Sequence, residues 1–340
     1  MSIDIASRRM EDDKETRLPI ALEQVGNVVL LQDAGLPQLI AMSGASAKFA
    51  YEEFFHARIR NPNTRKAYRH AVHNFLEAAR LADLELRQIT PSFVGQYFDS
   101  LTVGLATKKL HLSALRNFFD EMVVRHVVVL NPALSVRTER YQVIEGKTPE
   151  FTVRQVKRLL STMDTSHVVG LRDRAIFATL VYTAARVGAV AKLRQQDFYD
   201  AGDQYCFRFL DKGGKQREIP ARHDLRQYLL DYKCSADMMN AEPKQPLFLS
   251  AIGRTQRLSS NRMTADAIGY MLKRRLRDAG LPTRFSPHSF RVTTITDLLE
   301  QGVPLDDVQD LAGHSDPRTT RLYDRRNRKV KRNTVERISI

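Results

Sequence analysis

Cysteine is nearly absent from this sequence of 340 residues, in which only Cys206 and Cys234 occur. Two thiols are too few for a disulfide framework or for a zinc site with four thiolates. Long apolar runs are absent as well. The longest candidate, residues 123–130, is interrupted by Arg125 and His126 and is far shorter than the roughly 18 residues that span a membrane. The first residues contain no apolar stretch behind a basic start. We therefore expect no secretory signal and no membrane partner.

Acidic residues are fewer than basic ones. The sequence has 39 Asp and Glu and 53 Lys and Arg, which gives a formal charge of +14. The excess is unevenly distributed: residues 1–43 carry a net −3, residues 44–138 a net +5 and residues 139–340 a net +12. This charge makes nucleic acid the leading partner and favours a cytoplasmic, nucleoid-associated protein. A hydrophobic content of 43% is enough for folded cores, and the length suggests two domains.

Several catalytic motifs are also missing. The turn from Lys212 to Lys215 looks like part of a phosphate-binding loop, but Phe209 occupies the position of the required first glycine. The sequence has no His-Glu-x-x-His zinc helix and no Gly-x-Ser-x-Gly elbow. His70 and His73 have no further metal ligands close to them in the sequence. We therefore expect neither a cofactor nor a metal.

Residues 44–138 show the 3.6-residue periodicity of helices, and we interpret them as a helical domain. The apolar stripes predict four helices, which begin near Ser46, near Asn63 or Thr64, at Thr90-Pro91 and at Thr107. Residues 1–43 form a leader that we expect to be partly disordered. Residues 139–149 are polar and aperiodic, so we interpret them as a linker.

Residues 150–326 begin with a helix-starting signal, in which Thr152 and Gln155 fit a capping box and Phe151 and Val156 occupy the hydrophobic-staple positions. Helical patterns then cover residues 153–162, 171–184, 222–235, 263–279, 288–301 and 304–312. Two alternating segments, 204–210 and 216–220, flank a Gly-Gly turn and predict a β-hairpin. The predicted fold class is mainly α with a small β-sheet.

A set of phosphate-binding and proton-transferring side chains lies in this second half: Arg186, Lys212, His288, Arg291, His314 and Tyr323. His314 follows His288 by 26 residues, and Tyr323 follows His314 by nine. The local contexts are ARVGAVAKL, DKGGKQREIP, SPHSFRVTT and LAGHSDPRTTRLYDRR. In this order and context the set resembles the tyrosine recombinase, or phage integrase, family of site-specific DNA recombinases.

The resemblance implies that residues 44–138 are a SAM-like core-binding domain that binds DNA and that residues 150–326 are a mixed α/β catalytic domain. It also implies that Tyr323 attacks a DNA phosphate, forms a 3′-phosphotyrosyl bond and releases a 5′-hydroxyl. Arg186 and Arg291 are suited to bind the non-bridging phosphate oxygens. We expect these two charges to lower the pKa of the phenol.

The resemblance assigns roles to the other three residues. His288 accepts the phenolic proton, and His314 hydrogen-bonds the phosphate. Lys212 protonates the 5′-oxygen, with Lys215 as its rival. Two positions depart from the family pattern, because Ala189 replaces the usual acidic residue and Val292 replaces a frequent histidine. We expect activity to survive both changes.

The implied partner is double-stranded DNA with specific recombination sites, bound by two protomers per site and by a tetramer in the synapse. Accessory factors are not predicted. The candidate DNA-binding residues are Lys108, Lys109, Arg116, Lys215, Lys273, Arg274 and Arg275. The basic residues 327–340 are either a disordered tail or an element that packs on a neighbouring protomer. Two other functions stay open: a DNA-binding regulator without cleavage, and a topoisomerase-like or telomere-resolving enzyme.

Overall fold

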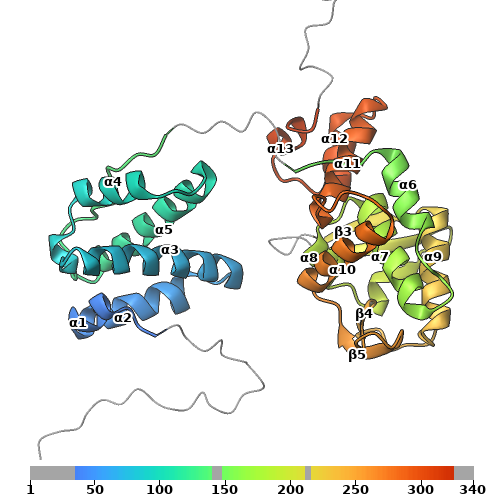
Figure 1. The fold of residues 1–340 in the computed structure, drawn as a ribbon, viewed down its shortest axis with the longest axis horizontal. Helices are drawn as coiled ribbons and strands as arrows, with labels where there is room; N and C mark the ends of the chain where they lie inside the picture. The colour runs from blue at the N-terminus through green and yellow to red at the C-terminus, as the bar shows by residue number, and fades with distance from the viewer. Residues whose placement is uncertain (1–34, 140–147, 211–215, 325–340) are drawn as a thin grey trace, which may run out of the picture. The chain divides into compact units, whose positions relative to one another are not determined.

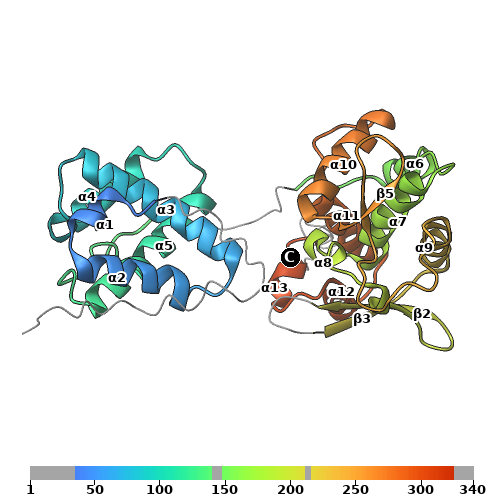
Figure 2. The same ribbon diagram turned by 90° about the horizontal axis from the view of Figure 1, so that it is seen from below.

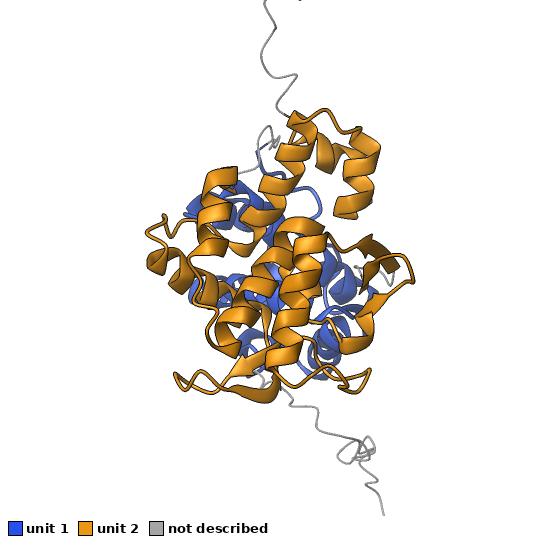
Figure 3. Ribbon diagram, turned by 90° about the vertical axis from the view of Figure 1, so that its right-hand side faces the viewer, with its two compact units in different colours: residues 1–141 blue, residues 142–340 orange. Residues whose placement is uncertain are grey.

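The structure is a computed structural model that describes residues 35–139, 148–210 and 216–324. The chain divides into two compact units, residues 1–141 and 142–340 (Figure 3). Among the described residues, no helix has both the length and the apolar character to cross a membrane. Within the same ranges, no three His, Cys, Asp or Glu residues cluster as metal ligands would.

Unit 1 is a bundle of helices, drawn in blue and green in Figure 1. Its helices are α1 (Gln38–Met42), α2 (Ala45–Glu53), a π-helical turn (Phe54–Arg58), α3 (Pro62–Leu81), a 3₁₀ turn (Leu86–Gln88), α4 (Pro91–Ser100) and α5 (Leu105–Val124). The four helices predicted from the sequence are confirmed, each beginning within about two residues of its expected start.

Side-chain caps start two of these helices. The Oδ1 atom of Asn61 accepts a hydrogen bond from the backbone amide of Asn63 at 2.9 Å, and Pro62 occupies the first helical position of α3. The hydroxyl of Thr90 accepts a hydrogen bond from the amide of Phe93 at 3.2 Å. These polar residues therefore fix where α3 and α4 begin.

Aromatic rings fill the core of unit 1. Phe75 of α3 makes edge-on contacts with Tyr97 of α4 and Phe119 of α5, at 5.1 and 5.9 Å between ring centroids. Leu39 and Ile40 of α1 are buried in the same core. The helical core thus includes part of the segment that we interpreted as a leader, and residues 1–34 of that leader lie outside the described residues.

Unit 2 combines helices with two small antiparallel sheets of order β1-β2-β3 and β4-β5. Its helices are α6 (Val153–Ser161), α7 (Val168–Thr183), α8 (Val187–Val190), α9 (His223–Ser235), α10 (Ala265–Asp278), α11 (Pro287–Glu300), α12 (Leu305–Ala312) and α13 (Pro317–Arg321). Its strands are β1 (Phe198–Asp200), β2 (Tyr205–Leu210), β3 (Gln216–Pro220), β4 (Leu249–Ala251) and β5 (Leu258–Arg262). The six predicted helices and the mainly α fold class are confirmed.

The predicted hairpin is confirmed in β2 and β3, which lie at one edge of unit 2 (Figure 2). Phe207 pairs with Ile219 and Phe209 pairs with Arg217 across the two strands. Phe207 and Phe209 are buried in the core of the unit, which fixes the register of the pair. The turn of the hairpin, residues 211–215, lies outside the described residues.

The first helix of unit 2 is anchored to α11. Thr152 and Gln155 form the predicted capping box, with reciprocal hydrogen bonds of 3.2 and 2.9 Å. The ring of Phe151 stacks on Phe285 at 4.0 Å and on Phe290 of α11 at 4.8 Å. These contacts fix the start of the unit against the helix that carries two of the candidate catalytic residues.

A buried ion-pair cluster joins α7 to α10. Asp173 is fully buried and accepts hydrogen bonds from the guanidinium groups of Arg172 and Arg275, the shortest at 2.6 and 2.7 Å. Arg172 also donates to the backbone carbonyl of Leu249 in β4 at 2.8 Å. One carboxylate and two arginines therefore connect two helices and a strand.

Candidate active site

Helix α11 supplies two of the candidate catalytic residues. It begins with a capping box at Ser286 and with Pro287 at its first position, so His288 lies in the first turn and Arg291 one turn later on the same face. Burial lowers the pKa of His288 below 6.5, and the charges of Arg291 and Arg186 lower it further. The imidazole is therefore neutral near pH 7 and able to accept a proton.

Arg291 is held by a backbone carbonyl. It is only 1% exposed, and its Nη1 atom donates a hydrogen bond of 2.5 Å to the carbonyl oxygen of Ala184. Ala184 follows α7 with a φ of 49°, a left-handed conformation that is uncommon for a residue with a Cβ atom. This sharp turn directs a carbonyl at the guanidinium. It supplies Arg291 with an acceptor in a site where position 189 has no acidic side chain.

Arg186 occupies the N-cap position of the short helix α8, at the connection from α7, and its side chain makes no capping hydrogen bond. Its charge lowers the pKa values of His288, His314 and Tyr323, so the guanidinium lies in the same electrostatic environment as those three groups. Ala189 is partly buried against the hydrophobic core of unit 2. An apolar contact thus replaces the acidic residue that is common in the resembled family.

The end of α12 leads to His314. Gly313 adopts a φ of 63° that ends the helix, and His314 is buried, with its Nδ1 atom 2.9 Å from the hydroxyl of Thr320. Burial lowers the pKa of His314 to about 4, and the charges of Arg291 and Arg186 contribute. The ring is therefore neutral, and the contact at Nδ1 leaves Nε2 as the nitrogen available for a phosphate oxygen.

Tyr323 stacks on His314. The two rings are nearly parallel, at an angle of 7° and a centroid distance of 6.0 Å. The pKa of Tyr323 is raised above 10, because burial raises it by more than Arg291 and Arg186 lower it. The two arginine charges therefore act in the expected direction, but burial outweighs them. A phenol that is protonated near pH 7 needs a proton acceptor to become a nucleophile.

Several candidate DNA-binding residues make contacts within their own unit. Arg116 donates to two backbone carbonyls of the loop after α5. Lys273 donates to two backbone carbonyls of the loop before α11. Arg275 is bound to the buried Asp173, and Arg274 lies 3.6 Å from the same carboxylate. These contacts give the basic residues a structural role, and their contact with DNA stays a prediction.

Four other lysines complete the candidate set. Lys108 and Lys109 lie on α5, with Lys109 exposed and Lys108 partly exposed. Lys212 and Lys215 lie outside the described residues, so their proposed role in proton transfer stays a prediction. The structure thus groups five of the six candidate catalytic residues in unit 2.

Sequence reasoning missed Arg217. This half-buried residue of β3 donates a hydrogen bond to the backbone carbonyl of Leu311 in α12, and its guanidinium lies over the ring of Phe209 at 5.4 Å. Its charge contributes to the lowered pKa of His314. The sequence offers no signal for this role, because the residues that Arg217 contacts in α12 are far away along the chain.

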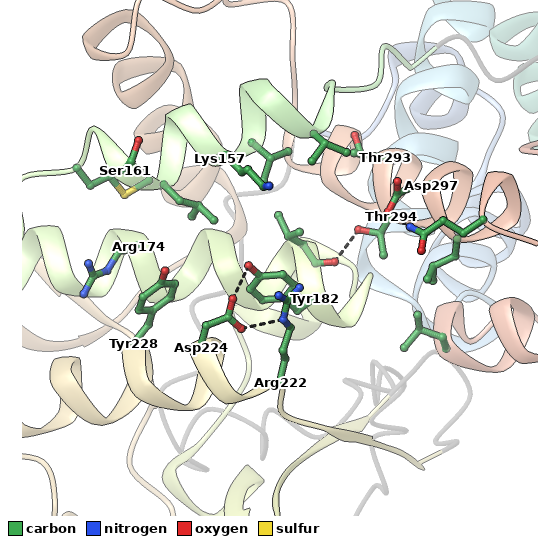
Figure 4. Close-up of a pocket in the computed structure, with 18 of the residues that line it drawn as sticks. Lys157, Ser161, Arg174, Tyr182, Arg222, Asp224, Tyr228, Thr293, Thr294 and Asp297 are labelled. Atoms are coloured by element: carbon green, nitrogen blue, oxygen red, sulfur yellow. Dashed lines mark hydrogen bonds and ion pairs between the residues drawn. The ribbon is translucent and has the colours of Figure 1, made fainter. Parts of the chain in front are cut away.

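A separate cavity of about 810 Å³ lies between α6, α7, α9 and α11 (Figure 4). Asp224 accepts a hydrogen bond of 2.8 Å from the hydroxyl of Tyr182 and pairs with Arg222 at 3.2 Å. Burial and the Asp224 carboxylate raise the pKa of Tyr182 to about 12. None of the five described candidate catalytic residues lines this cavity, so it is distinct from the candidate active site.

The family model described as "Phage integrase family" matches residues 150–329, which include this arrangement of arginines, histidines and Tyr323. The chain belongs to the phage integrase family. The model of the N-terminal SAM-like domain of phage integrases matches residues 50–126. As a phage integrase family member, the chain is an enzyme of the tyrosine recombinase class.

Known proteins similar to this integrase-family chain are recombinases. A tyrosine recombinase XerC of Chlamydia pneumoniae is 29% identical over 76% of this chain and 80% of its own length. The fold is similar to XerH bound to difH DNA after cleavage, with a TM-score of 0.64 and 19% identity over 86% of this chain and 83% of that one. It is also similar to a lambda integrase tetramer on a Holliday junction, with a TM-score of 0.60 and 18% identity over 87% and 83%.

Proposed function

We propose that this integrase-family chain is a site-specific DNA recombinase that cleaves and rejoins DNA strands through a covalent bond to Tyr323. The observation that carries the proposal is the environment of the Tyr323 phenol. It stacks on the neutral His314, and the charges of Arg291 and Arg186 act on it. A nucleophile and two cations suited to a phosphate therefore act in one environment.

The reaction begins when His288 accepts the phenolic proton. The Tyr323 oxygen then attacks phosphorus. A bond forms between this oxygen and the phosphorus, which stays attached to the 3′ end of the cleaved strand, and the P–O5′ bond breaks. Arg186 and Arg291 stabilise the negative charge that develops on the non-bridging oxygens. The new phosphodiester bond retains the energy of the broken one. Attack by a 5′-hydroxyl reverses the steps, and no nucleotide is consumed.

Lys212 is the proposed acid that gives a proton to the departing 5′-oxygen, and Lys215 is its rival. Both residues lie in the turn between β2 and β3. Support for the assignment comes from the family context DKGGKQREIP around this turn. The two lysines can be distinguished by experiment. Replacement of the acid is expected to slow cleavage of the natural substrate but not of a substrate whose leaving group needs no proton, whereas replacement of the other lysine does not show this difference.

Tyr323→Phe tests the proposal. On a DNA substrate whose nicked strand diffuses away after cleavage, the natural chain is expected to accumulate a covalent protein–DNA adduct. Tyr323→Phe is expected to form none while it binds the DNA with a Kd within about twofold, since only the nucleophilic oxygen is lost. Tyr270→Phe is the matched control, because Tyr270 is 79% exposed on α10.

The same assay separates the other two functions. A DNA-binding regulator forms no adduct in the natural chain, whereas adduct formation by Tyr323→Phe rules out the proposed nucleophile. A topoisomerase-like enzyme relaxes supercoiled plasmid that carries no recombination site. A recombinase is expected to need two matching sites, and the products then distinguish integration, excision, resolution and inversion.

The proposed partner is duplex DNA, with two protomers on each recombination site and four in the synapse. The lambda integrase tetramer on a Holliday junction supports this arrangement by its similar fold. We divide the chain into a leader (1–43), whose residues 38–42 form α1 and pack into the helical core, a DNA-binding domain (44–138), a linker (139–149), a catalytic domain (150–326) and a basic element (327–340) that packs on the neighbouring protomer. A DNA substrate of this kind implies action in the cytoplasm at the nucleoid.

A further inference from the structure

Arg217 joins the hairpin of unit 2 to the segment that carries His314. Arg217 is the second residue of β3, directly after the turn that contains Lys212 and Lys215. Its Nη1 atom donates to the carbonyl of Leu311 in the last turn of α12. A helix leaves its last carbonyls without helical partners, and a cation at this end also interacts favourably with the helix dipole.

The end of α12 is rigidly connected to His314. The amide of His314 donates to the carbonyl of Gln309 at 3.1 Å, and the side-chain amide of Gln309 donates to the carbonyl of His314 at 3.1 Å. Gly313 makes the left-handed turn between them. A shift of the Leu311 carbonyl therefore displaces His314, and with it the ring that stacks on Tyr323.

We propose that Arg217 is a positioning residue that holds the His314–Tyr323 segment in place through the end of α12. This inference rests on the proposed function. The proposed phosphate ligand and the proposed nucleophile both follow this contact along the chain. Both must address a single phosphate, so a displaced segment slows the attack of the Tyr323 oxygen.

The charge of Arg217 has a second consequence. Four cationic or titratable groups act on His314: Arg291, Arg186, His288 and Arg217. Each of them opposes protonation of the buried imidazole. Loss of the Arg217 charge is expected to raise the pKa of His314 from about 4, a change that NMR of the labelled histidine ring measures directly.

The test compares Arg217→Met, which retains length and the apolar contact, with Arg208→Met. Arg208 is the matched control, because it lies on β2, pairs with Glu218 at 3.1 Å and lies over the ring of Tyr199 at 4.7 Å. Arg217→Met is expected to slow single-turnover cleavage by about 100-fold, while the Kd for DNA stays within about twofold. Arg208→Met is expected to cleave at the natural rate.

A substrate with sulfur in place of the bridging 5′-oxygen separates attack from protonation of the leaving group, because a thiolate leaves without a proton. Arg217→Met is expected to lose the same factor on this substrate, because the attacking oxygen is displaced. Recovery of the lost rate on the sulfur substrate, or a rate equal to that of Arg208→Met, overturns the inference. If Arg217→Met does not fold, Arg217→Lys carries the test, with retained charge, an unchanged His314 pKa and the same loss on both substrates.

The inference and the proposed function fail in different ways. Absence of a covalent adduct in the natural chain, or an adduct with Tyr323→Phe, overturns the proposed function. An active natural chain whose Arg217→Met variant cleaves normally overturns only the role of Arg217.

Discussion

At the scale of single residues, the environment of the candidate site favours neutral histidines and a protonated tyrosine. Burial and neighbouring arginines hold His288 and His314 in their neutral forms, whereas burial keeps the Tyr323 phenol protonated. A neutral imidazole and a protonated phenol are the starting state of general-base catalysis. In the proposed mechanism the arginines therefore have two functions, since they would bind phosphate oxygens and also keep the base unprotonated.

This protonation state predicts the pH dependence of cleavage. The pKa of His288 lies below 6.5, so the base is fully competent above that pH and is lost as the pH falls through its lowered pKa. The acid limb of kcat/KM, which reports the free enzyme, is expected to have its midpoint below pH 6.5. Cleavage rates at limiting DNA concentration between about pH 4.5 and 8 measure it.

A His288→Ala control is expected to lose this limb together with most of the rate. A midpoint at or above 6.5 in the natural chain contradicts the assignment of His288 as the base.

The sequence identified the side chains of the site but not what holds them. His288 and Arg291 follow from helical spacing, and Tyr323 follows from its context. The carbonyl of Ala184 belongs to the backbone, so no side-chain pattern reveals that it holds Arg291. Arg217 was missed for a related reason, because its contact with α12 depends on how distant segments pack.

At the scale of elements, periodicity predicted most of the long helices because each buries one stripe of apolar residues, whereas in α7 residues 175–180 are all buried. The strands β4 and β5 were missed. They are three and five residues long, none of their residues is fully buried, and their pairing has a register shift between Leu249 and Ala251. Without alternation of buried and exposed positions, a strand leaves no period-two signal in the sequence.

The ion pairs between α7 and α10 predict a large loss of stability on a small change. Asp173→Asn retains the shape of the side chain but leaves the buried Arg172 and Arg275 without their counter-charge. We expect the free energy of unfolding to fall by about 3 kcal/mol, as for other buried pairs that lose one partner. Urea unfolding followed by far-UV circular dichroism measures it, since the chain contains no tryptophan.

Asp278→Asn is the matched control, because Asp278 pairs with the same Arg275 at 3.6 Å but is 53% exposed. Its loss is expected to cost less than about 1 kcal/mol. Equal effects of the two substitutions mean that the buried carboxylate does not hold the helices together.

At the scale of the whole molecule, net charge indicated a nucleic-acid partner but not the residues that contact it. Residues 44–138 and 139–340 carry +5 and +12, yet Arg116, Lys273 and Arg275 use their charged groups in bonds within their own units. Positive charge counted from the sequence therefore gives only an upper limit on the number of phosphate contacts. Salt dependence counts these contacts, because each neutralised phosphate releases counterions.

Lys108 provides the sharpest test of this distinction. If its ammonium group on α5 contacts a phosphate, Lys108→Ala is expected to make the slope of log K against log salt shallower by about 0.9, equally on specific and scrambled duplexes. Lys244→Ala, in an exposed position between α9 and β4, is expected to leave the slope unchanged. An unchanged slope for Lys108→Ala means that this lysine belongs to a solvated face of the bundle.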